Sequence, residues 1–407
     1  MAEAGAALLD GSAWRAFCRR LEAIGERLQA PGFADEPRAR SEGYRAISRW
    51  LVYAVQQEIE AGDPRFPGFV RHQDPWNQWG GPNPDNVYLR ANVDPRLAYR
   101  VWTRDARGLR QAIFSLHEGD MQLSEYGVFG ERSLDQLPLA SDGSLEIRLV
   151  PAPQVSRSEP KASEVHKEWH CIELDPRARI FTIRLYQSDW ESDALPGFQI
   201  ERVGADGEPR PPLDPAALAA GLERAARWVE ASVDYWNRYT GQGWARSTPN
   251  VASPARSTPG GADNILYGSC FWELEREQAL VLEVERPDAD YWNFVTHTMP
   301  WLETGEFDRR QVSLNDRQTH VDDDGVVRIV VAHRDPGAPN WIDTEERRRG
   351  MLVYRWVWAR SNPLPRAKVV ALDALRASLP PGHPTVTPDA RRAQLARRRE
   401  AVWNRYR

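Results

Sequence analysis

The chain has 407 residues and a formal net charge of -5 at pH 7, with 27% charged and 41% hydrophobic residues. This length predicts two packed domains, and the mild acidity gives no general attraction to nucleic acid or to a membrane surface. The chain also contains no run of about 18 apolar residues and no recognisable signal peptide, so we expect a cytoplasmic protein.

Two amphipathic helices are predicted before any strand. Ser12 is a candidate cap for the first, whose apolar residues recur every three or four positions. These residues are Trp14, Phe17, Leu21, Ile24 and Leu28. The second helix is predicted over residues 42–60, with an apolar stripe at Tyr44, Ile47, Leu51, Val55 and Ile59.

Short runs rich in β-branched and aromatic residues follow, separated by turn-forming pairs such as Asp142-Gly143. They predict strands at residues 87–93, 99–103, 112–117, 145–150, 180–187 and 198–203. No segment of helical length interrupts them, so we expect antiparallel sheets rather than a parallel one. Among the residues expected on interior strand faces are Val101, Ile113, Ile147, Ile183, Leu282, Val284, Ile329 and Val353.

A long helix is predicted from Asp214 to about Gly241, with Pro215 at its first position. A second set of strands follows at residues 266–274, 280–285, 291–297, 326–332, 351–359 and 368–372. The last twenty residues contain seven arginines and predict a helix after Pro388. We expect this helix to pack Leu395, Val402 and Trp403 on the body of the protein, rather than to bind nucleic acid or lipid.

The two β-rich halves contain matching segments. Gly80-Gly81, followed by Asp85-Asn86, corresponds to Gly260-Gly261, followed by Asp263-Asn264. Residues 113–117 and 133–135 match residues 293–297 and 313–315 at the same offset. Such self-similarity indicates an internal duplication.

The predicted fold is therefore mainly β with flanking helices, in which two related, jelly-roll-like β-sandwich units arose by internal duplication. The predicted boundaries are an N-terminal helical segment (1–75), a first β-sandwich unit (76–210), a helix and loop connector (211–262), a second β-sandwich unit (263–375) and a basic C-terminal tail or helix (376–407).

The second half contains an ordered set of motifs: Tyr291-Trp292, 310–315, Asp324-Gly325, 335–337, 340–343, Arg349-Gly350 and 361–363. Through these motifs it resembles the family called domain of unknown function 1214. Residues 80–88 look like the upstream part of longer members of that family. The resemblance implies a β-sandwich architecture and no set of catalytic residues.

His117 and His297 are the leading candidate catalytic residues, because each ends a predicted strand at corresponding positions and histidine suits proton transfer near neutral pH. Asp120 and Asp135 are the candidate acidic partners of His117. The alternative is that both histidines only hydrogen-bond to neighbouring loops. The candidate substrate-binding residues are Tyr88, Arg90, Trp292, Arg309 and Asn315.

Other chemistry has less support. His117, Glu118 and Asp120, or His166 and His170, lack a recognised metal-ligand spacing, so no metal site and no cofactor are predicted. Asp85-Asn86 and Asp263-Asn264 are expected to brace their own turns. Arg309 and Arg310 are at least as well placed to pair with Asp308 or Asp316 as to hold an anionic substrate group. The three cysteines, Cys18, Cys171 and Cys270, fit neither a disulfide framework nor a zinc ribbon.

Two classes of function remain. In the first, the chain is an enzyme, namely a hydrolase, lyase or isomerase, that acts on a mostly apolar small molecule in an aromatic-lined cleft between the two β units. In the second, it is a non-catalytic small-molecule-binding or scaffolding protein. The expected partner is a small molecule, with no nucleic acid and no membrane, and a homo-oligomer is left open.

Overall fold

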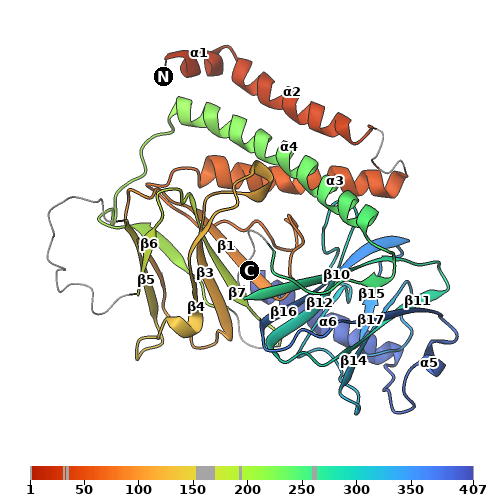
Figure 1. Ribbon diagram of the computed structural model, residues 1–407. Helices are drawn as coiled ribbons and strands as arrows, with labels where there is room; N and C mark the ends of the chain where they lie inside the picture. Colours follow the sequence, from red (N-terminus) through yellow and green to blue (C-terminus); the bar gives the residue numbers. More distant parts are fainter. Residues whose placement is uncertain are drawn as a thin grey trace. The chain divides into compact units, whose positions relative to one another are not determined.

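The computed structural model describes residues 2–30, 33, 36–152, 170–191, 195–258 and 264–406 (Figure 1). Its contacts divide the chain into two units. Unit 1 comprises Met1–His72, Val87–Tyr186 and Leu195–Tyr235, and unit 2 comprises Gln73–Asn86, Gln187–Ala194 and Trp236–Arg407. The segment that contains Gly80-Gly81 therefore belongs to unit 2, although unit 1 residues precede and follow it in the chain.

Unit 1 begins with three helices and uses the first part of a fourth. These are α1 (Ala2–Leu9), α2 (Ser12–Arg27), α3 (Pro37–Val55), which continues into the π-helical turn η1 (Gln56–Glu60), and α4 (Pro215–Arg246). Arg20 of α2 pairs with Glu230 of α4 at 2.6 Å, and Glu58 of η1 pairs with Arg224 at 2.8 Å. Within this unit α4 consequently lies between α2 and α3 (Figure 1).

The predicted helices are confirmed, with three local corrections. Gly11 rather than Ser12 occupies the cap position of α2, and Trp14 is 57% exposed. The buried face of α3 contains Trp50 and Tyr53, while Tyr44 is exposed. Of the apolar stripe predicted for this helix, Ile47 is buried in α3, but the large rings of Trp50 and Tyr53 take other buried positions.

Two four-stranded sheets complete unit 1. One has the order β1-β7-β3-β4 and the other the order β6-β5-β2-β8. The first consists of β1 (Asn86–Asn92), β7 (Ile180–Tyr186), β3 (Gln111–His117) and β4 (Val128–Ser133). The second consists of β6 (His170–Leu174), β5 (Leu145–Pro151), β2 (Tyr99–Thr103) and β8 (Gln199–Arg202). The single-turn 3-10 helices η2 (Met121–Leu123) and η3 (Leu134–Gln136) join β3 to β4 and β4 to β5.

Unit 2 also contains two sheets, with the orders β13-β12-β16-β10-β9 and β15-β14-β11-β17. The first consists of β13 (Ser313–Asn315), β12 (Ala289–His297), β16 (Arg349–Ala359), β10 (Ile265–Glu273) and β9 (Val251–Ala252). The second consists of β15 (Trp341–Asp343), β14 (Val326–Ala332), β11 (Gln278–Glu285) and β17 (Arg366–Ala371). Helices α5 (Leu375–Ser378) and α6 (Pro388–Tyr406) follow.

The two units share one strand order. When β1 to β8 are matched with β10 to β17 in sequence, both sheets of unit 1 reproduce the order found in unit 2, and β9 is the one added strand. The described sheets are mainly antiparallel, as expected, and the described strands of each unit include one parallel pair, β5 with β6 and β14 with β15. This agreement is the pattern that a duplication leaves, and the duplication itself stays a prediction.

The main core of unit 2 lies between its two sheets. Leu280, Leu282 and Val284 of β11 point into this core, opposite Phe294 and Trp356 of the other sheet. The alternate β11 residues, including Val281, pack on the outer face against a smaller cluster with Leu375 and Leu379. Because both faces of the sheet are covered here, residues 279–282 of β11 and 329–332 of β14 are continuously apolar rather than alternating. All eight predicted interior residues are buried.

Three buried arginines attach α6 to unit 2. Arg391, Arg398 and Arg405 recur every seven residues and therefore lie on one face of the helix. Arg398 donates from Nη2 to the hydroxyl of Ser313 at 2.6 Å, and Arg391 donates from Nη1 to the side chain of Gln311 at 2.9 Å. The expectation that α6 packs mainly through apolar residues is corrected, since Val402 is buried but Trp403 remains 38% exposed.

Candidate functional site

The two candidate histidines end equivalent strands, as predicted: His117 is the last residue of β3 and His297 is the last residue of β12. Their surroundings differ, however. His117 lies beside charged side chains of unit 1, whereas His297 is 2% exposed and lines a small cavity in unit 2. A catalytic role for either histidine stays a prediction.

A buried ion pair forms the centre of the unit 1 site. Arg90, on β1, donates from Nη1 to Oδ1 of Asp120 at 2.7 Å, and the indole of Trp228 donates to Oδ2 of the same carboxylate at 2.8 Å. Arg90 is 4% exposed and Asp120 is 7% exposed. Burial by itself would lower the pKa of Arg90, but Asp120, together with Tyr53 and Glu58, outweighs this effect and the pKa is raised. Arg90 is therefore charged at any physiological pH.

Aromatic rings surround this ion pair. The ring centroid of Tyr53 lies 6.0 Å from the guanidinium carbon of Arg90 and 4.9 Å from the ring of Trp228. The ring of His72 lies 6.0 Å from Tyr53 and 5.3 Å from Tyr88. We call the set the Arg90 cluster; it consists of Tyr53, His72, Tyr88, Arg90, His117, Asp120 and Trp228.

His117 belongs to this cluster as a neutral imidazole. Its Nε2 lies 3.0 Å from the hydroxyl of Ser115 and 3.2 Å from that of Thr182. Burial, followed by the nearby guanidinium groups of Arg90 and Arg184, lowers the pKa of His117 to about 3, although Asp120 acts in the opposite direction. The same causes hold the pKa of His72 well below its usual value. At pH 7 neither histidine competes with Arg90 as a cation.

Several hydrogen-bond donors of the Arg90 cluster lack an acceptor among the described residues. Within the part of the chain that the structure describes, Nε and Nη2 of Arg90 and the hydroxyl of Tyr53 are buried without a hydrogen-bond partner. Burial also raises the pKa of Tyr53, so this hydroxyl keeps its proton. Buried polar groups in native proteins are nearly always hydrogen-bonded, and a group that is not calls for an explanation such as a missing ion or ligand. This arrangement can accept an anion.

His297 occupies a different kind of site. The hydroxyl of Thr304 donates to the carbonyl of Pro82 at 2.7 Å, so it accepts the contact of 3.1 Å from Nδ1 of His297. This assignment leaves Nε2 as an acceptor, and it has no partner among the described residues. The cavity that His297 lines has a volume of about 10 Å³, which is enough for about one water molecule. Burial and Arg355 keep the pKa of His297 well below its usual value.

Asp85 organises a buried polar network in unit 2. Its carboxylate is 0% exposed and accepts from the indole of Trp190, the hydroxyl of Tyr291 and the amide of Asn315, each at 2.6 Å, and from the amide of Asn293 at 3.1 Å. Asp85 was expected to brace its own turn. That role instead belongs to Asn83, whose side chain accepts from the backbone N–H of Asp85 at 3.1 Å.

The two glycines before this network have backbone conformations that other residues rarely adopt. Gly80 and Gly81 have φ angles of 73° and 71°. A Cβ atom on Gly81 would lie 3.2 Å from Leu302, which is tighter than an ordinary contact. The pair therefore turns the chain sharply enough to bring Asp85 into the interior of unit 2. Residues 259–263, which include the matching Gly260-Gly261 and Asp263, lie outside the described residues.

The remaining candidate residues are placed as follows. Trp292 is part of the hydrophobic core of unit 2, and Asn315 belongs to the Asp85 network. Asp135 is exposed and accepts from the hydroxyl of Ser133. Arg309 is exposed and lies 3.6 Å from Asp308, which is the alternative that the sequence left open. The structure thus brings together His117, Asp120, Arg90 and Tyr88, and leaves the other candidates elsewhere.

One group of side chains could hold a metal ion. Among the described residues, His320, Asp322 and His383 offer ligand atoms that all lie within 4.8 Å of one another. The sequence analysis missed this group because His383 is far from the other two in sequence. It also missed Tyr53, His72 and Trp228 of the Arg90 cluster. The available signal was the density of aromatic residues in α3 and α4.

Comparison with known proteins identifies a family for this chain but assigns it no activity. The chain is 31% identical to an uncharacterized protein from Burkholderia cenocepacia, with a TM-score of 0.81, and the match covers 91% of this chain and 99% of that one. The VPA0106 protein from Vibrio parahaemolyticus is 13% identical, with a TM-score of 0.46 and coverage of 80% and 96%. No protein-family model and no curated protein matches the chain. No described helix is long and apolar enough to cross a membrane.

Proposed function

The chain belongs to the family of the uncharacterized Burkholderia cenocepacia protein, and we propose that it binds a small organic anion with an aromatic or apolar body at the Arg90 cluster. The observation that carries this proposal is the presence of buried N–H donors on Arg90 beside the buried hydroxyl of Tyr53, all without partners among the described residues. A carboxylate or phosphate group would supply the acceptors that these donors lack.

The physical argument concerns the cost of unmet hydrogen bonds. Leaving a buried donor unsatisfied costs about 1–3 kcal/mol, and more when the donor is charged. A guanidinium presents its donors in a planar fork that matches a carboxylate in two parallel hydrogen bonds. Asp120 occupies Nη1 of Arg90 at 2.7 Å, which leaves Nε and Nη2 for a second anion.

The neighbouring rings determine what else the ligand carries. Tyr53, His72, Tyr88 and Trp228 contribute the rings of the cluster, and the lowered pKa of His72 keeps its imidazole neutral at pH 7. Aromatic side chains bind apolar and aromatic ligand bodies through large contact areas. The mostly apolar small molecule expected from the sequence therefore fits this cluster, provided that it also carries an anionic group.

Of the two classes left open by the sequence, this arrangement supports binding more directly than acid–base catalysis. A general acid or base works best when its pKa lies near the working pH. The pKa of His117 is lowered to about 3, so the free protein holds a weak base there and no acid at pH 7.

One observation favours the enzyme as a second candidate. The hydroxyl of Ser115 lies 3.0 Å from Nε2 of His117, and the hydroxyl of Thr182 lies 3.2 Å from it. A ligand anion bound to Arg90 would offset one cause of the lowered pKa and make His117 more basic. Hydrolysis of a phenyl ester that carries a carboxylate, lost in His117→Gln and in Ser115→Ala, would support this candidate.

Two further expectations stay proposals. The resemblance to domain of unknown function 1214 rests on the motifs in the second half of the chain. The cytoplasmic location rests on the sequence, in which the three cysteines fit neither a disulfide framework nor a zinc ribbon.

The experiment is a calorimetric titration of the full-length chain with benzoate and with phenyl phosphate. Arg90→Lys keeps the positive charge beside Asp120 but removes the fork, so we expect about 10- to 100-fold weaker binding. Tyr53→Phe should weaken binding about 3- to 10-fold, which corresponds to one lost hydrogen bond.

The matched control is Tyr99→Phe. Tyr99 is also buried in unit 1, but its hydroxyl accepts from the backbone of Asp94 at 2.7 Å and donates to Pro64 at 3.0 Å. Removing that hydroxyl should leave anion binding unchanged. Equal affinities in the wild type, Arg90→Lys and Tyr53→Phe would refute the proposed site.

A further inference from the structure

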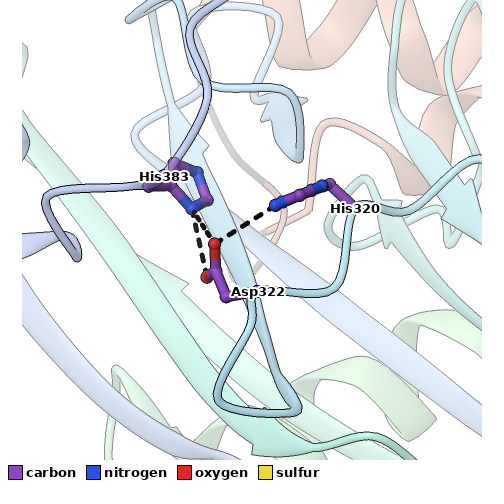
Figure 2. Close-up of side chains that lie close together, drawn as sticks. All are labelled: His320, Asp322 and His383. Carbon is purple, nitrogen blue, oxygen red and sulfur yellow. Dashed lines mark hydrogen bonds and ion pairs between the residues drawn. The ribbon is translucent and has the colours of Figure 1, made fainter.

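Three side chains of unit 2 converge on one point, two from neighbouring positions in the sequence and one from a distant segment. His320 and Asp322 lie between β13 and β14, and His383 lies on a turn after α5. Figure 2 shows the two imidazole rings pointing at the carboxylate of Asp322. Nδ1 of His383 lies 2.8 Å from Oδ1 of Asp322, and Nε2 of His320 lies 3.2 Å from the same oxygen.

These separations suit atoms that share one metal ion. Zinc lies about 2.0–2.1 Å from histidine nitrogen and 2.0–2.2 Å from carboxylate oxygen. Two ligands at such distances are therefore about 3.0 Å apart at an octahedral angle and about 3.4 Å apart at a tetrahedral one. The two histidine–carboxylate contacts fall close to this range, so small adjustments of the side chains would accommodate an ion.

The backbone holds each of the three residues in place. Val321 pairs with Val327 in a short antiparallel bridge, so His320 and Asp322 on either side of it point to the same face. The side chain of Asn340 accepts from the backbone N–H of His320 at 2.8 Å and donates to its carbonyl at 2.8 Å.

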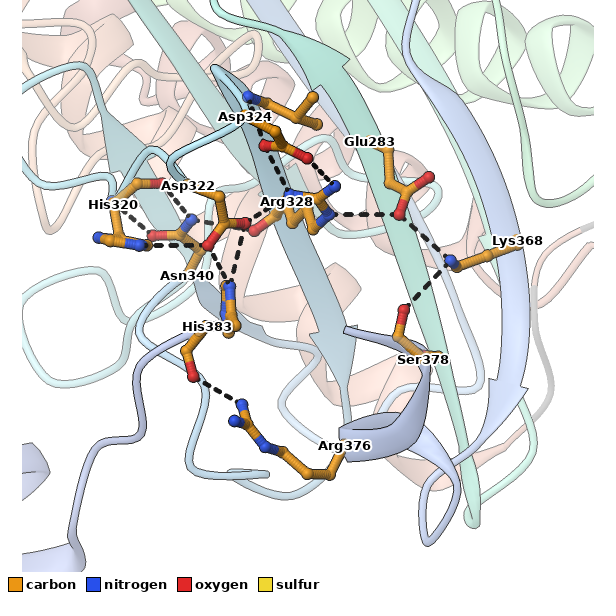
Figure 3. Close-up of polar contacts among 11 residues, drawn as sticks. Glu283, His320, Asp322, Asp324, Arg328, Asn340, Lys368, Arg376, Ser378 and His383 are labelled. Carbon is orange, nitrogen blue, oxygen red and sulfur yellow. Dashed lines mark hydrogen bonds and ion pairs between the residues drawn. The ribbon is translucent and has the colours of Figure 1, made fainter. Parts of the chain in front are cut away.

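His383 is fixed from the other side. Arg376 donates to the carbonyl of His383 at 2.6 Å and to that of Pro381 at 2.9 Å. Figure 3 shows this contact together with the contacts of Asp322 and His320. Because the ligands come from two segments that are both tied down, little ordering would remain when an ion binds.

The charges around Asp322 leave room for a cation. Arg328 donates to its Oδ2 at 2.7 Å and also pairs with Asp324 and Glu283, while Lys368 lies 3.2 Å from Glu283 (Figure 3). Three carboxylates thus face two cationic side chains, so one negative charge is left over. Arg328 occupies Oδ2 and holds the carboxylate with Oδ1 toward both imidazoles, as residues behind a metal ligand commonly do.

The donor set indicates the class of metal. Calcium and magnesium prefer all-oxygen sites, whereas two imidazoles with one carboxylate suit divalent iron, cobalt, nickel or zinc. Asp322 and His383 are nearly buried, but the side chain of His320 is 36% exposed, so further coordination positions can open toward solvent beside it.

We propose that His320, Asp322 and His383 bind one divalent first-row transition metal ion through Nε2, Oδ1 and Nδ1 respectively. The alternative is a hydrogen-bonded cluster that only ties the turn after α5 to the strands. The two differ in what happens when metal is offered. In the alternative, each imidazole keeps its proton toward Asp322 and no ion displaces it.

The test is a titration of the full-length, chelator-treated chain with Zn²⁺ and with Co²⁺, followed by calorimetry and by the visible spectrum of bound Co²⁺. We expect one ion per chain, a rise in melting temperature with metal, and no response to Mg²⁺. His320→Ala should weaken binding by at least about 100-fold, since even changes behind the ligands cost 10- to 100-fold. Its exposure allows the fold to persist in this variant.

The control is His170→Ala, which removes a partly exposed histidine of unit 1 whose ring contacts the carbonyl of Pro138. It should bind metal as the wild type does. The proposal is overturned if the wild type binds neither ion at 1:1 stoichiometry, or if His320→Ala binds as tightly as the control. In either result, loss of stability in His320→Ala would identify the group as the hydrogen-bonded cluster alone.

Discussion

Replacing Tyr53 by phenylalanine should stabilise the ligand-free protein. Tyr53 is 0% exposed, and its hydroxyl has no hydrogen-bond partner among the described residues. A buried hydroxyl in this state costs about 1–3 kcal/mol of desolvation. Its removal leaves the ring contacts with Trp228 and His72 unchanged, so we expect the free energy of unfolding of unit 1 to rise by about 1 kcal/mol.

Tyr99→Phe should change the free energy of unfolding in the opposite direction. Its hydroxyl makes two hydrogen bonds to the backbone, at 2.7 and 3.0 Å, and losing them leaves a half-buried N–H and a half-buried carbonyl unpaired. We expect a loss of about 1–2 kcal/mol.

The assay is thermal unfolding after extensive dialysis. For a unit of about 200 residues, 1 kcal/mol corresponds to a shift of about 2–4 °C. Equal destabilisation by Tyr53→Phe and Tyr99→Phe would show that the Tyr53 hydroxyl is satisfied in the free protein, and would refute the reasoning.

Two other predictions concern single residues. Asp85→Asn should destabilise unit 2 by about 3–5 kcal/mol in urea unfolding, because a neutral amide cannot accept from all four donors of the buried network. The control is Asp105→Asn, which alters an exposed pair with Arg107 and should leave the urea midpoint of unfolding unchanged. The pKa of His117 is about 3 in the folded protein, below its unfolded value of about 6.5. Between these pH values only the unfolded state takes up a proton at His117, so the free energy of unfolding falls as the pH is lowered from 6.5 toward 3. In that window His117→Gln should reduce the slope of the unfolding free energy against pH by up to about 1.4 kcal/mol per unit; an unchanged slope would contradict the low pKa.

Most of the fold could be predicted from local patterns. Strands such as β2 (Tyr99–Thr103) were predicted with their observed bounds, because alternating apolar residues and flanking turns define them. The strands that were missed are β4, β6, β9, β13 and β15. The shortest, such as β13 (Ser313–Asn315) and β15 (Trp341–Asp343), have three residues or fewer, which is too short for a periodic signal. Their positions are set by pairing with a neighbouring strand.

The site was only partly predictable for the same reason. His117 was predicted as a strand-end residue and Asp120 as its acidic neighbour in sequence, while Arg90 and Tyr88 lie on a predicted strand. The structure places these four residues in one cluster. Tyr53 and Trp228 come from α3 and α4, and the spacing of residues in either helix does not show that the two rings contact each other beside the Arg90–Asp120 pair.

Burial of charge was the least predictable feature. Arg391, Arg398 and Arg405 face inward because carbonyl and side-chain groups of unit 2 accept hydrogen bonds from them. From the sequence alone, an arginine-rich helix predicts a solvent-exposed surface, because charged residues are rarely buried without partners. The partners come from distant segments, so only the folded structure shows them.

The most direct test of the proposed function is a crystal structure of the protein with 4-bromobenzoate, whose bromine can be located by anomalous scattering. The account predicts a carboxylate within hydrogen-bond distance of Nε or Nη2 of Arg90 and of the Tyr53 hydroxyl, with the brominated ring against the aromatic residues of the Arg90 cluster. Bromine sites only elsewhere, at a concentration that saturates binding in solution, would contradict it.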